Sequence, residues 1–93
     1  MNFNSDRKRS TQSGVTLADL REGETAELAA LRLPPPTSEH LMWLGFVPGA
    51  KITAGQSGPG GDPRVYTVSG TAFALRRETA QHMIVVSSRG AQG

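Results

Sequence analysis

The sequence contains no cysteine, few aromatic residues and no long apolar run. The absence of cysteine excludes disulfides, zinc–thiolate sites, iron–sulfur clusters and thiol nucleophiles. Because no apolar run approaches the roughly 20 residues that a membrane-spanning helix needs, we expect no direct membrane insertion. Aromatic residues make up 5% of the 93 residues, which leaves few rings for stacking on nucleic-acid bases. A chain of this length is expected to build one domain around one core.

Charge is distributed unevenly along the chain, whose formal net charge is +2. Residues 1–14 include Arg7-Lys8-Arg9, whereas residues 15–86 carry six basic and seven acidic side chains, a net charge of −1. A nucleic-acid-binding domain usually carries positive charge on its folded body, so we expect no nucleic-acid partner. We interpret residues 1–14 as a disordered, solvated arm and residues 87–93 as a disordered tail. The alternative for the basic triplet is an anchor on an acidic partner or membrane surface, and no apolar segment follows it to suggest a signal peptide.

Residues 41–49 organise the expected fold. Leu41 and Leu44 lie three apart and therefore share one face of a helix. Gly45 stands where a helix ends in a left-handed residue, which glycine adopts without a steric clash. Pro48-Gly49 has the signature of a type II turn, because proline presets φ at the second position and glycine supplies positive φ at the third. These residues predict a short helix, a helix stop at Gly45 and a tight turn into a strand.

The segments before this helix are expected to be short. Thr16 is a candidate N-cap, with Asp19 three residues later as in a capping box. Pro34-Pro35-Pro36 predicts a stiff extended linker, because proline is excluded from a helix interior and from a central strand. Thr37 or Ser38 is then expected to cap the helix.

Short strands bounded by turn residues account for most of the remaining chain. Gly58 to Pro63 is interpreted as a hairpin tip, Ser69-Gly70 as a tight turn and residues 76–81 as a helical turn. Five short strands with one or two helical turns predict an all-β fold, a small closed or half-closed barrel. The predicted strands are residues 24–33, 51–57, 64–68, 71–75 and 82–86.

Several motifs in consistent order resemble the FeoA family. They are Leu17-x-x-Leu20-x-x-Gly23, Leu41-x-x-Leu44-Gly45-Phe46-x-Pro48-Gly49, Gly61-Asp62-Pro63, Gly70-x-x-Phe73-Ala74-Leu75-Arg76-Arg77-x-x-Ala80 and Ile84-Val85-Val86. The resemblance covers residues 15–86 and implies a small SH3-like barrel. It also implies a cytoplasmic accessory protein of bacterial ferrous-iron transport, acting on FeoB, a large membrane transporter with a cytoplasmic GTPase domain. The proline run, Trp43 and the N-terminal arm depart from the family pattern.

Residues that could carry chemistry are sparse. His40 and His82 lie far apart in the sequence, and Glu39 beside His40 would point in a different direction on a helix. No spacing of serine, histidine and aspartate indicates a catalytic triad. We therefore predict that the protein is not an enzyme and that it has no catalytic residues, no metal site and no cofactor.

An apolar patch at the end of the predicted helix is the first candidate partner-binding site. Trp43 lies about 100° from Leu44 around the helix and should project outward. Tryptophan is enriched at interface hot spots, so we predict that Met42, Trp43 and Phe46 dock the transporter. The same patch could dock a second copy of the chain in a weak homo-oligomer. The alternative is that Trp43 folds back and covers the proline linker.

Arg76 and Arg77 are the second candidate partner-binding site, since arginine is favoured at interfaces. They could meet an acidic groove or a phosphate. The alternative is that they flank the last helical turn and pair with Glu78 or with solvent. Gly45, Pro48, Gly49 and Gly70 are expected to serve as structural turn residues.

Three functions compete at this point. The first is an accessory module that binds a FeoB-type transporter, as the resemblance implies. The second is an SH3-like module of a metal-responsive transcriptional regulator, although no helix-turn-helix segment accompanies it. The third is a nucleic-acid-binding small barrel, which the near-neutral charge of residues 15–86 disfavours. We favour the first.

Overall fold

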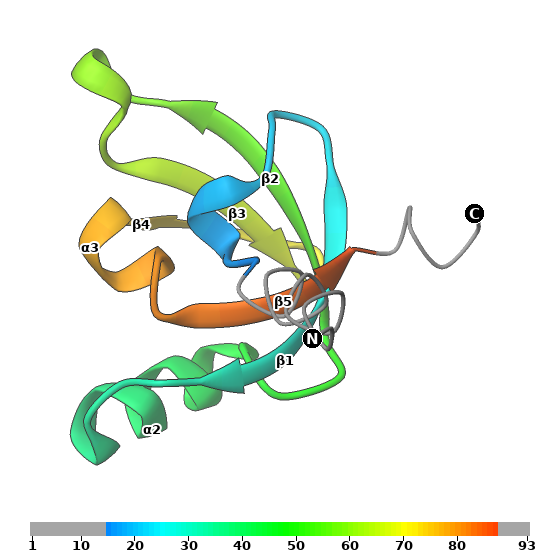
Figure 1. The fold of residues 1–93 in the computed structure, drawn as a ribbon, viewed down its shortest axis with the longest axis vertical. Coiled ribbons are helices and arrows are strands. Elements are labelled where there is room, and N and C mark those ends of the chain that lie inside the picture. The colour runs from blue at the N-terminus through cyan, green and yellow to red at the C-terminus, as the bar shows by residue number, and fades with distance from the viewer. Residues whose placement is uncertain (1–14, 88–93) are drawn as a thin grey trace, which may run out of the picture.

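A computed structural model describes residues 15–87, as a small barrel of five antiparallel strands (Figure 1). The predicted arm at residues 1–14 and residues 88–93 of the predicted tail lie outside the described residues. No helix within residues 15–87 is long and apolar enough to cross a membrane. The elements, in chain order, are η1 (Leu17–Asp19), β1 (Thr25–Leu31), α2 (Pro35–Leu44), β2 (Lys51–Ser57), η2 (Pro59–Gly61), β3 (Arg64–Val68), β4 (Thr71–Leu75), α3 (Arg77–Ala80) and β5 (Met83–Ser87).

The sheet has the strand order β4-β3-β2-β1-β5, and every neighbouring pair is antiparallel. The predicted strands at residues 51–57, 64–68 and 71–75 are confirmed. The first strand is shorter than predicted, and the last begins and ends one residue later than predicted. The β3–β4 hairpin turns at Ser69-Gly70, where both residues have positive φ, of 52° and 80°. This geometry matches the twist of the flanking strands in a two-residue hairpin.

The start of the described chain pairs with β5. The Val85 amide donates to the Val15 carbonyl at 3.0 Å, and Thr16 forms an isolated bridge with Ile84. The predicted link between Thr16 and Asp19 is confirmed, because the Thr16 amide donates to the Asp19 carboxylate at 2.9 Å. Within the described chain the buried core is wholly apolar. It comprises Leu17, Leu20, Ala26, Leu28, Leu41, Phe46, Ile52, Ala54, Tyr66, Val68, Leu75, Ala80, Met83 and Val85.

Helix α2 begins at Pro35, and its N-cap is Pro34, three residues before the predicted cap at Thr37. The prediction of an extended Pro34-Pro35-Pro36 linker holds for Pro34, with φ −57° and ψ 148°, and is wrong for Pro35 and Pro36, which open the helix. Proline is tolerated in the first helical turn, since an amide there has no intrahelical acceptor and the fixed φ is already helical. Ser38 is not the N-cap either, because it lies inside the helix and its hydroxyl donates back to the Leu33 carbonyl at 3.0 Å.

Helix α2 ends at Gly45 in a Schellman motif. Gly45 has a φ of 113°, and its amide donates to the Met42 carbonyl at 3.0 Å. The Phe46 amide donates to the Leu41 carbonyl, also at 3.0 Å. This motif typically brings the residue after the glycine into apolar contact with the last helical turn. Leu41 and Phe46 are indeed both buried.

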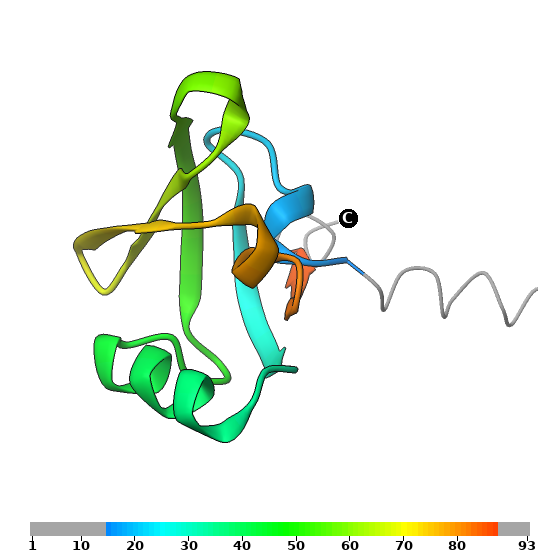
Figure 2. The same cartoon turned by 90° about the vertical axis from the view of Figure 1, so that its left-hand side faces the viewer.

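A tight turn then leads from α2 into β2. The Ala50 amide donates to the Val47 carbonyl at 2.9 Å, and Gly49 has a φ of 97°. The Gly49 amide also donates to the Leu28 carbonyl at 2.7 Å, which ties the turn to β1. Figure 2 shows the result, with α2 lying across one end of the barrel and the η2 tip at the other.

Candidate functional site

An exposed apolar surface lies on α2 and on the residue that follows its Schellman motif. The exposed fractions of the side chains are 87% for Trp43, 42% for Met42 and 37% for Val47. Together with Glu39 they line an open groove of about 550 Å³. We call these four residues the α2 surface. Three apolar side chains and one carboxylate can offer a partner hydrophobic contact together with a single charge.

The helical periodicity explains why Trp43 is exposed. Leu41 is buried and Leu44 is partly buried against the core, so the side of α2 that carries them faces the barrel. Trp43 is displaced from this side and projects into solvent, as predicted. The alternative in which Trp43 covers the proline segment is wrong, because a side chain that is 87% exposed covers almost nothing.

Phe46 does not belong to the α2 surface, and the prediction that grouped it with Met42 and Trp43 is wrong. Its side chain is fully buried and its ring lies 5.5 Å from the ring of Phe73, at an interplanar angle of 60°. The reason is the Schellman motif at Gly45, which reverses the chain and directs the next side chain into the core. Val47 occupies the exposed position that was expected for Phe46.

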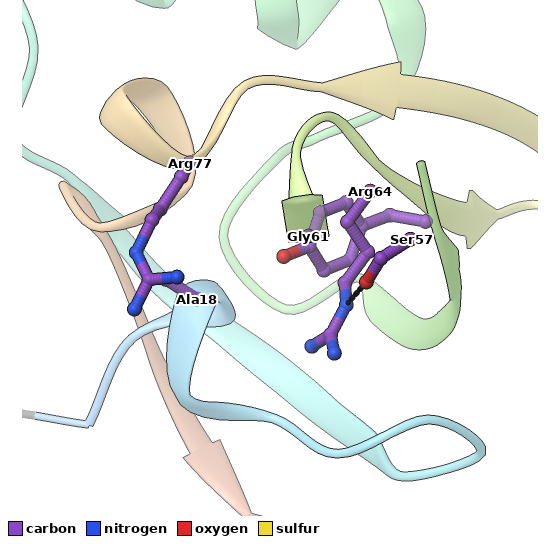
Figure 3. Close-up of a pocket in the computed structure, with 6 residues that line it drawn as sticks. Ala18, Ser57, Gly61, Arg64 and Arg77 are labelled. Atoms are coloured by element: carbon purple, nitrogen blue, oxygen red, sulfur yellow. Dashed lines mark hydrogen bonds between the residues drawn. The ribbon is translucent and has the colours of Figure 1, made fainter. Parts of the chain in front are cut away.

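A second, smaller cavity lies where three distant segments meet (Figure 3). It has a volume of about 110 Å³, and we call it the arginine pocket. Both predicted partner-binding arginines are exposed, but Arg77 lines the pocket and Arg76 does not. The structure therefore separates two arginines that are adjacent in sequence. The lining residues are Ala18, Ser57, Gly61, Arg64, Tyr66 and Arg77.

Arg64 is held in place at the arginine pocket by two side-chain hydrogen bonds. Its Nε donates to the Ser57 hydroxyl at 3.1 Å, and an Nη donates to the Leu20 carbonyl. Sequence analysis did not identify Arg64 as a site residue. The alternation of β3 carried a signal, since residues two apart on a strand face the same side and Arg64 precedes Tyr66 by two.

Tyr66 forms the buried floor of the arginine pocket. Its hydroxyl donates to the Leu17 carbonyl at 3.1 Å, which links β3 to η1. Burial raises the pKa of Tyr66 above 10.0, because the phenolate would lose its hydration. Arg64 and Arg77 oppose this rise in the pKa through their positive charges, and Asp62 adds slightly to it.

The two histidines lie on different parts of the fold. His40 lies on α2 and His82 lies between α3 and β5, and both side chains are exposed. Within residues 15–87 no three histidine, aspartate or glutamate side chains are grouped so that they could hold a metal ion.

The FeoA domain family matches residues 15–87 of the chain. A comparison of the sequence with curated proteins found no match. Solved structures of FeoA proteins are similar to the chain. The FeoA protein of Chlorobium tepidum is 32% identical, with a TM-score of 0.75, and the match covers 78% of this chain and 70% of that one.

Two further solved structures extend this similarity. The iron(II) transport protein A of Clostridium thermocellum is 32% identical, with a TM-score of 0.77, over 82% of this chain and 47% of that one. The FeoA of Stenotrophomonas maltophilia, an SH3 domain protein solved in complex with zinc, is 32% identical with a TM-score of 0.67. That match covers 76% of this chain and 88% of the other. A manganese-dependent transcriptional repressor, at 18% identity and a TM-score of 0.70, shares the fold alone.

Proposed function

This chain belongs to the FeoA family, which is associated with ferrous-iron transport, and we propose that it is a cytoplasmic accessory protein of such a system. In this proposal it is not an enzyme. It binds a FeoB-type membrane transporter, which carries a GTPase domain, through protein–protein contacts. The family match over residues 15–87 supports the transport role. The nature of the α2 surface supports protein contact as the way in which that role is performed.

The observation that carries the proposal is the exposure of Trp43. Its side chain is 87% exposed on a helix whose opposite side packs on the barrel. An indole ring offers a large rigid apolar area together with one hydrogen-bond donor, which is why tryptophan is enriched at interface hot spots. Met42 and Val47 extend the apolar area beside it, and Glu39 borders it. This composition, an apolar centre with a polar rim, is typical of protein interfaces.

Charge and aromatic content favour a protein partner over nucleic acid. The α2 surface contains one carboxylate and no basic side chain. A phosphate backbone is bound through lysine and arginine side chains, and its binding weakens steeply with salt. Apolar contact with a protein does not need basic side chains. We therefore expect binding to the transporter to depend only weakly on salt concentration.

The experiment compares capture of the transporter, in native membranes of the same cell, by immobilised full-length chain and by two variants. Trp43→Ala removes the proposed anchor. Val86→Ala is the control, because Val86 is also exposed, at 57%, but lies on β5 outside the α2 surface. A hot-spot residue contributes about 2 kcal/mol or more, so Trp43→Ala should weaken capture about thirtyfold.

Each outcome of this comparison has a defined meaning. Capture that is weakened by Trp43→Ala and unchanged by Val86→Ala supports the proposal. Equal capture by Trp43→Ala and the unmodified chain would show that the α2 surface is not the docking site. A failure of the unmodified chain to capture the transporter would contradict the proposed partnership. Loss of self-association alone in Trp43→Ala would instead assign the surface to a homo-oligomer.

A further inference from the structure

The arginine pocket is built from three segments that are far apart in the sequence (Figure 3). Ala18 comes from η1, Ser57 and Gly61 come from the β2–β3 tip, and Arg77 begins α3. A volume of about 110 Å³ exceeds the roughly 10–15 Å³ that a cavity needs to hold one water molecule. The pocket therefore has room for a small polar group such as a carboxylate.

The two cations of the pocket differ in how they are held. The Arg64 guanidinium is fixed by Ser57 and by the Leu20 carbonyl, so its position needs no ligand. Arg77 is fixed at its backbone, where its amide donates to Asp62 Oδ1 at 2.8 Å. Its guanidinium has no hydrogen bond or ion pair with any residue of the described part of the chain. Figure 3 shows the two side chains on opposite sides of the pocket.

Both cations act on the pocket floor. Arg64 and Arg77 each lower the pKa of the Tyr66 hydroxyl, against the effect of burial. Both guanidinium groups are therefore within electrostatic reach of one point in the pocket. An anion placed there would meet two positive charges.

The charge balance of the pocket selects the kind of anion. Asp62 offsets one of the two positive charges, which leaves a net charge of +1 among Arg64, Arg77 and Asp62. The Asp19 carboxylate on η1 is not counted, because it does not line the pocket and is not among the charges that shift the pKa of Tyr66. A carboxylate carries one negative charge and matches this balance. A phosphate monoester carries about −1.5 to −2 and would leave an excess of negative charge.

We propose that the arginine pocket binds a single carboxylate, supplied by an aspartate or glutamate side chain of a protein partner and bridged between Arg64 and Arg77. Arginine forms charge-assisted, often bidentate hydrogen bonds to carboxylates, and Arg77 has its donors free for this purpose within the described chain. The assignment of the carboxylate to the transporter rests on the proposed function. The binding of a small carboxylate to the pocket is independent of the proposed function.

The first test titrates isotopically labelled full-length chain with sodium acetate, at constant ionic strength against sodium chloride, and follows the amide signals by NMR. Acetate should shift the signals of Ala18 and Arg77 in a saturable way. The test variant is Arg77→Gln. The matched control is Arg76→Gln. It removes the same charge from the neighbouring residue, whose side chain does not line the pocket.

We expect Arg77→Gln to weaken acetate binding at least tenfold and Arg76→Gln to leave it within twofold. Equal weakening by both variants would show that only the general positive charge matters, and would overturn the proposal. Unshifted pocket signals would overturn it as well. Inorganic phosphate that binds tenfold more tightly than acetate would overturn the assignment to a carboxylate.

The second test applies the same two variants to capture of the transporter. Selective loss with Arg77→Gln would place the carboxylate on the transporter. Capture that is unaffected by Arg77→Gln, together with normal acetate binding by the unmodified chain, would assign the pocket to another protein partner. Failure of the unmodified chain to capture the transporter would contradict the proposed function. The acetate titration would then decide by itself whether the pocket binds a carboxylate.

Discussion

Two aromatic residues, three positions apart, should respond in opposite ways to replacement by alanine. Phe46 is fully buried and packs against Phe73, whereas Trp43 is 87% exposed. Phe46→Ala should destabilise the protein severely. Trp43→Ala should leave its stability almost unchanged, although it removes the larger side chain.

The magnitudes follow from burial. Truncation of a buried phenylalanine to alanine typically costs about 3–5 kcal/mol, since transfer free energy is lost and a cavity remains. A domain of this size has a total stability near the lower end of about 5–15 kcal/mol, so Phe46→Ala would remove half of it or more. The corresponding fall in Tm is at least about 12 °C. An exposed substitution such as Trp43→Ala usually changes stability by no more than about 0.5 kcal/mol.

The assay is urea unfolding followed by far-ultraviolet circular dichroism. Trp43 is the one tryptophan of the chain and is already in water, so its fluorescence is a poor reporter of unfolding. Phe46→Leu serves as a second variant in case Phe46→Ala does not fold. It keeps most of the apolar volume and should cost less than about 1.5 kcal/mol.

A larger loss of stability in Trp43→Ala than in Phe46→Ala would contradict these assignments of burial. If the free energy of unfolding of Phe46→Ala were within about 1 kcal/mol of that of the unmodified protein, the ring would not be part of the core. A Trp43→Ala variant destabilised by several kcal/mol would show that the indole packs on the barrel, which would also remove the basis of the proposed docking surface.

Three further predictions concern backbone and pH. Gly45→Ala should cost about 1–3 kcal/mol through its φ of 113° alone, because the nearest atom to the added carbon is 3.7 Å away; chemical denaturation measures this. Gly55→Ala should destabilise the folded protein by about 1–3 kcal/mol through crowding, since the added carbon would lie 3.2 Å from the Val65 carbonyl oxygen. The raised pKa of Tyr66 means that the unfolded chain ionises first, so stability should fall as pH rises above about 10. Tyr66→Phe should reduce that slope in denaturation series across this range, and an unchanged slope would exclude Tyr66 as its cause.

The strands and the helix stop could be predicted because their signals are local. Gly45, Pro48 and Gly49 each restrict the backbone in a way that does not depend on the rest of the fold. The Ser69-Gly70 pair similarly specifies a hairpin between two alternating segments. These features place β2, β3 and β4 correctly from sequence alone.

The start of α2 was misjudged because a run of prolines is compatible with two backbone structures. A proline run can be an extended linker, or it can open a helix whose first amides have no intrahelical acceptor. The hydrogen bond from Ser38 to the Leu33 carbonyl belongs to the second arrangement. Only the packing of α2 on the barrel decides between them.

Phe46 was misplaced because it was grouped with Met42 and Trp43 by closeness in sequence, although it follows the helix stop. A left-handed glycine reverses the chain direction, so the angular relation to Trp43 no longer holds beyond Gly45. The Schellman rule, which pairs Phe46 with Leu41, predicts burial instead. The arginine pocket was beyond local reasoning, since Ala18, Arg64 and Arg77 approach one another only through the tertiary fold.

The most direct test of the account is whether Trp43 itself reports the binding of the transporter. Labelled full-length chain is titrated with the purified cytoplasmic part of the transporter, and the indole N–H signal of the single tryptophan is followed by NMR. Docking through Trp43 should shift or broaden this signal on binding, together with the amide signals of α2, while the amide signal of Val86 on β5 stays unchanged. A complex that forms while the indole signal stays unmoved would contradict it.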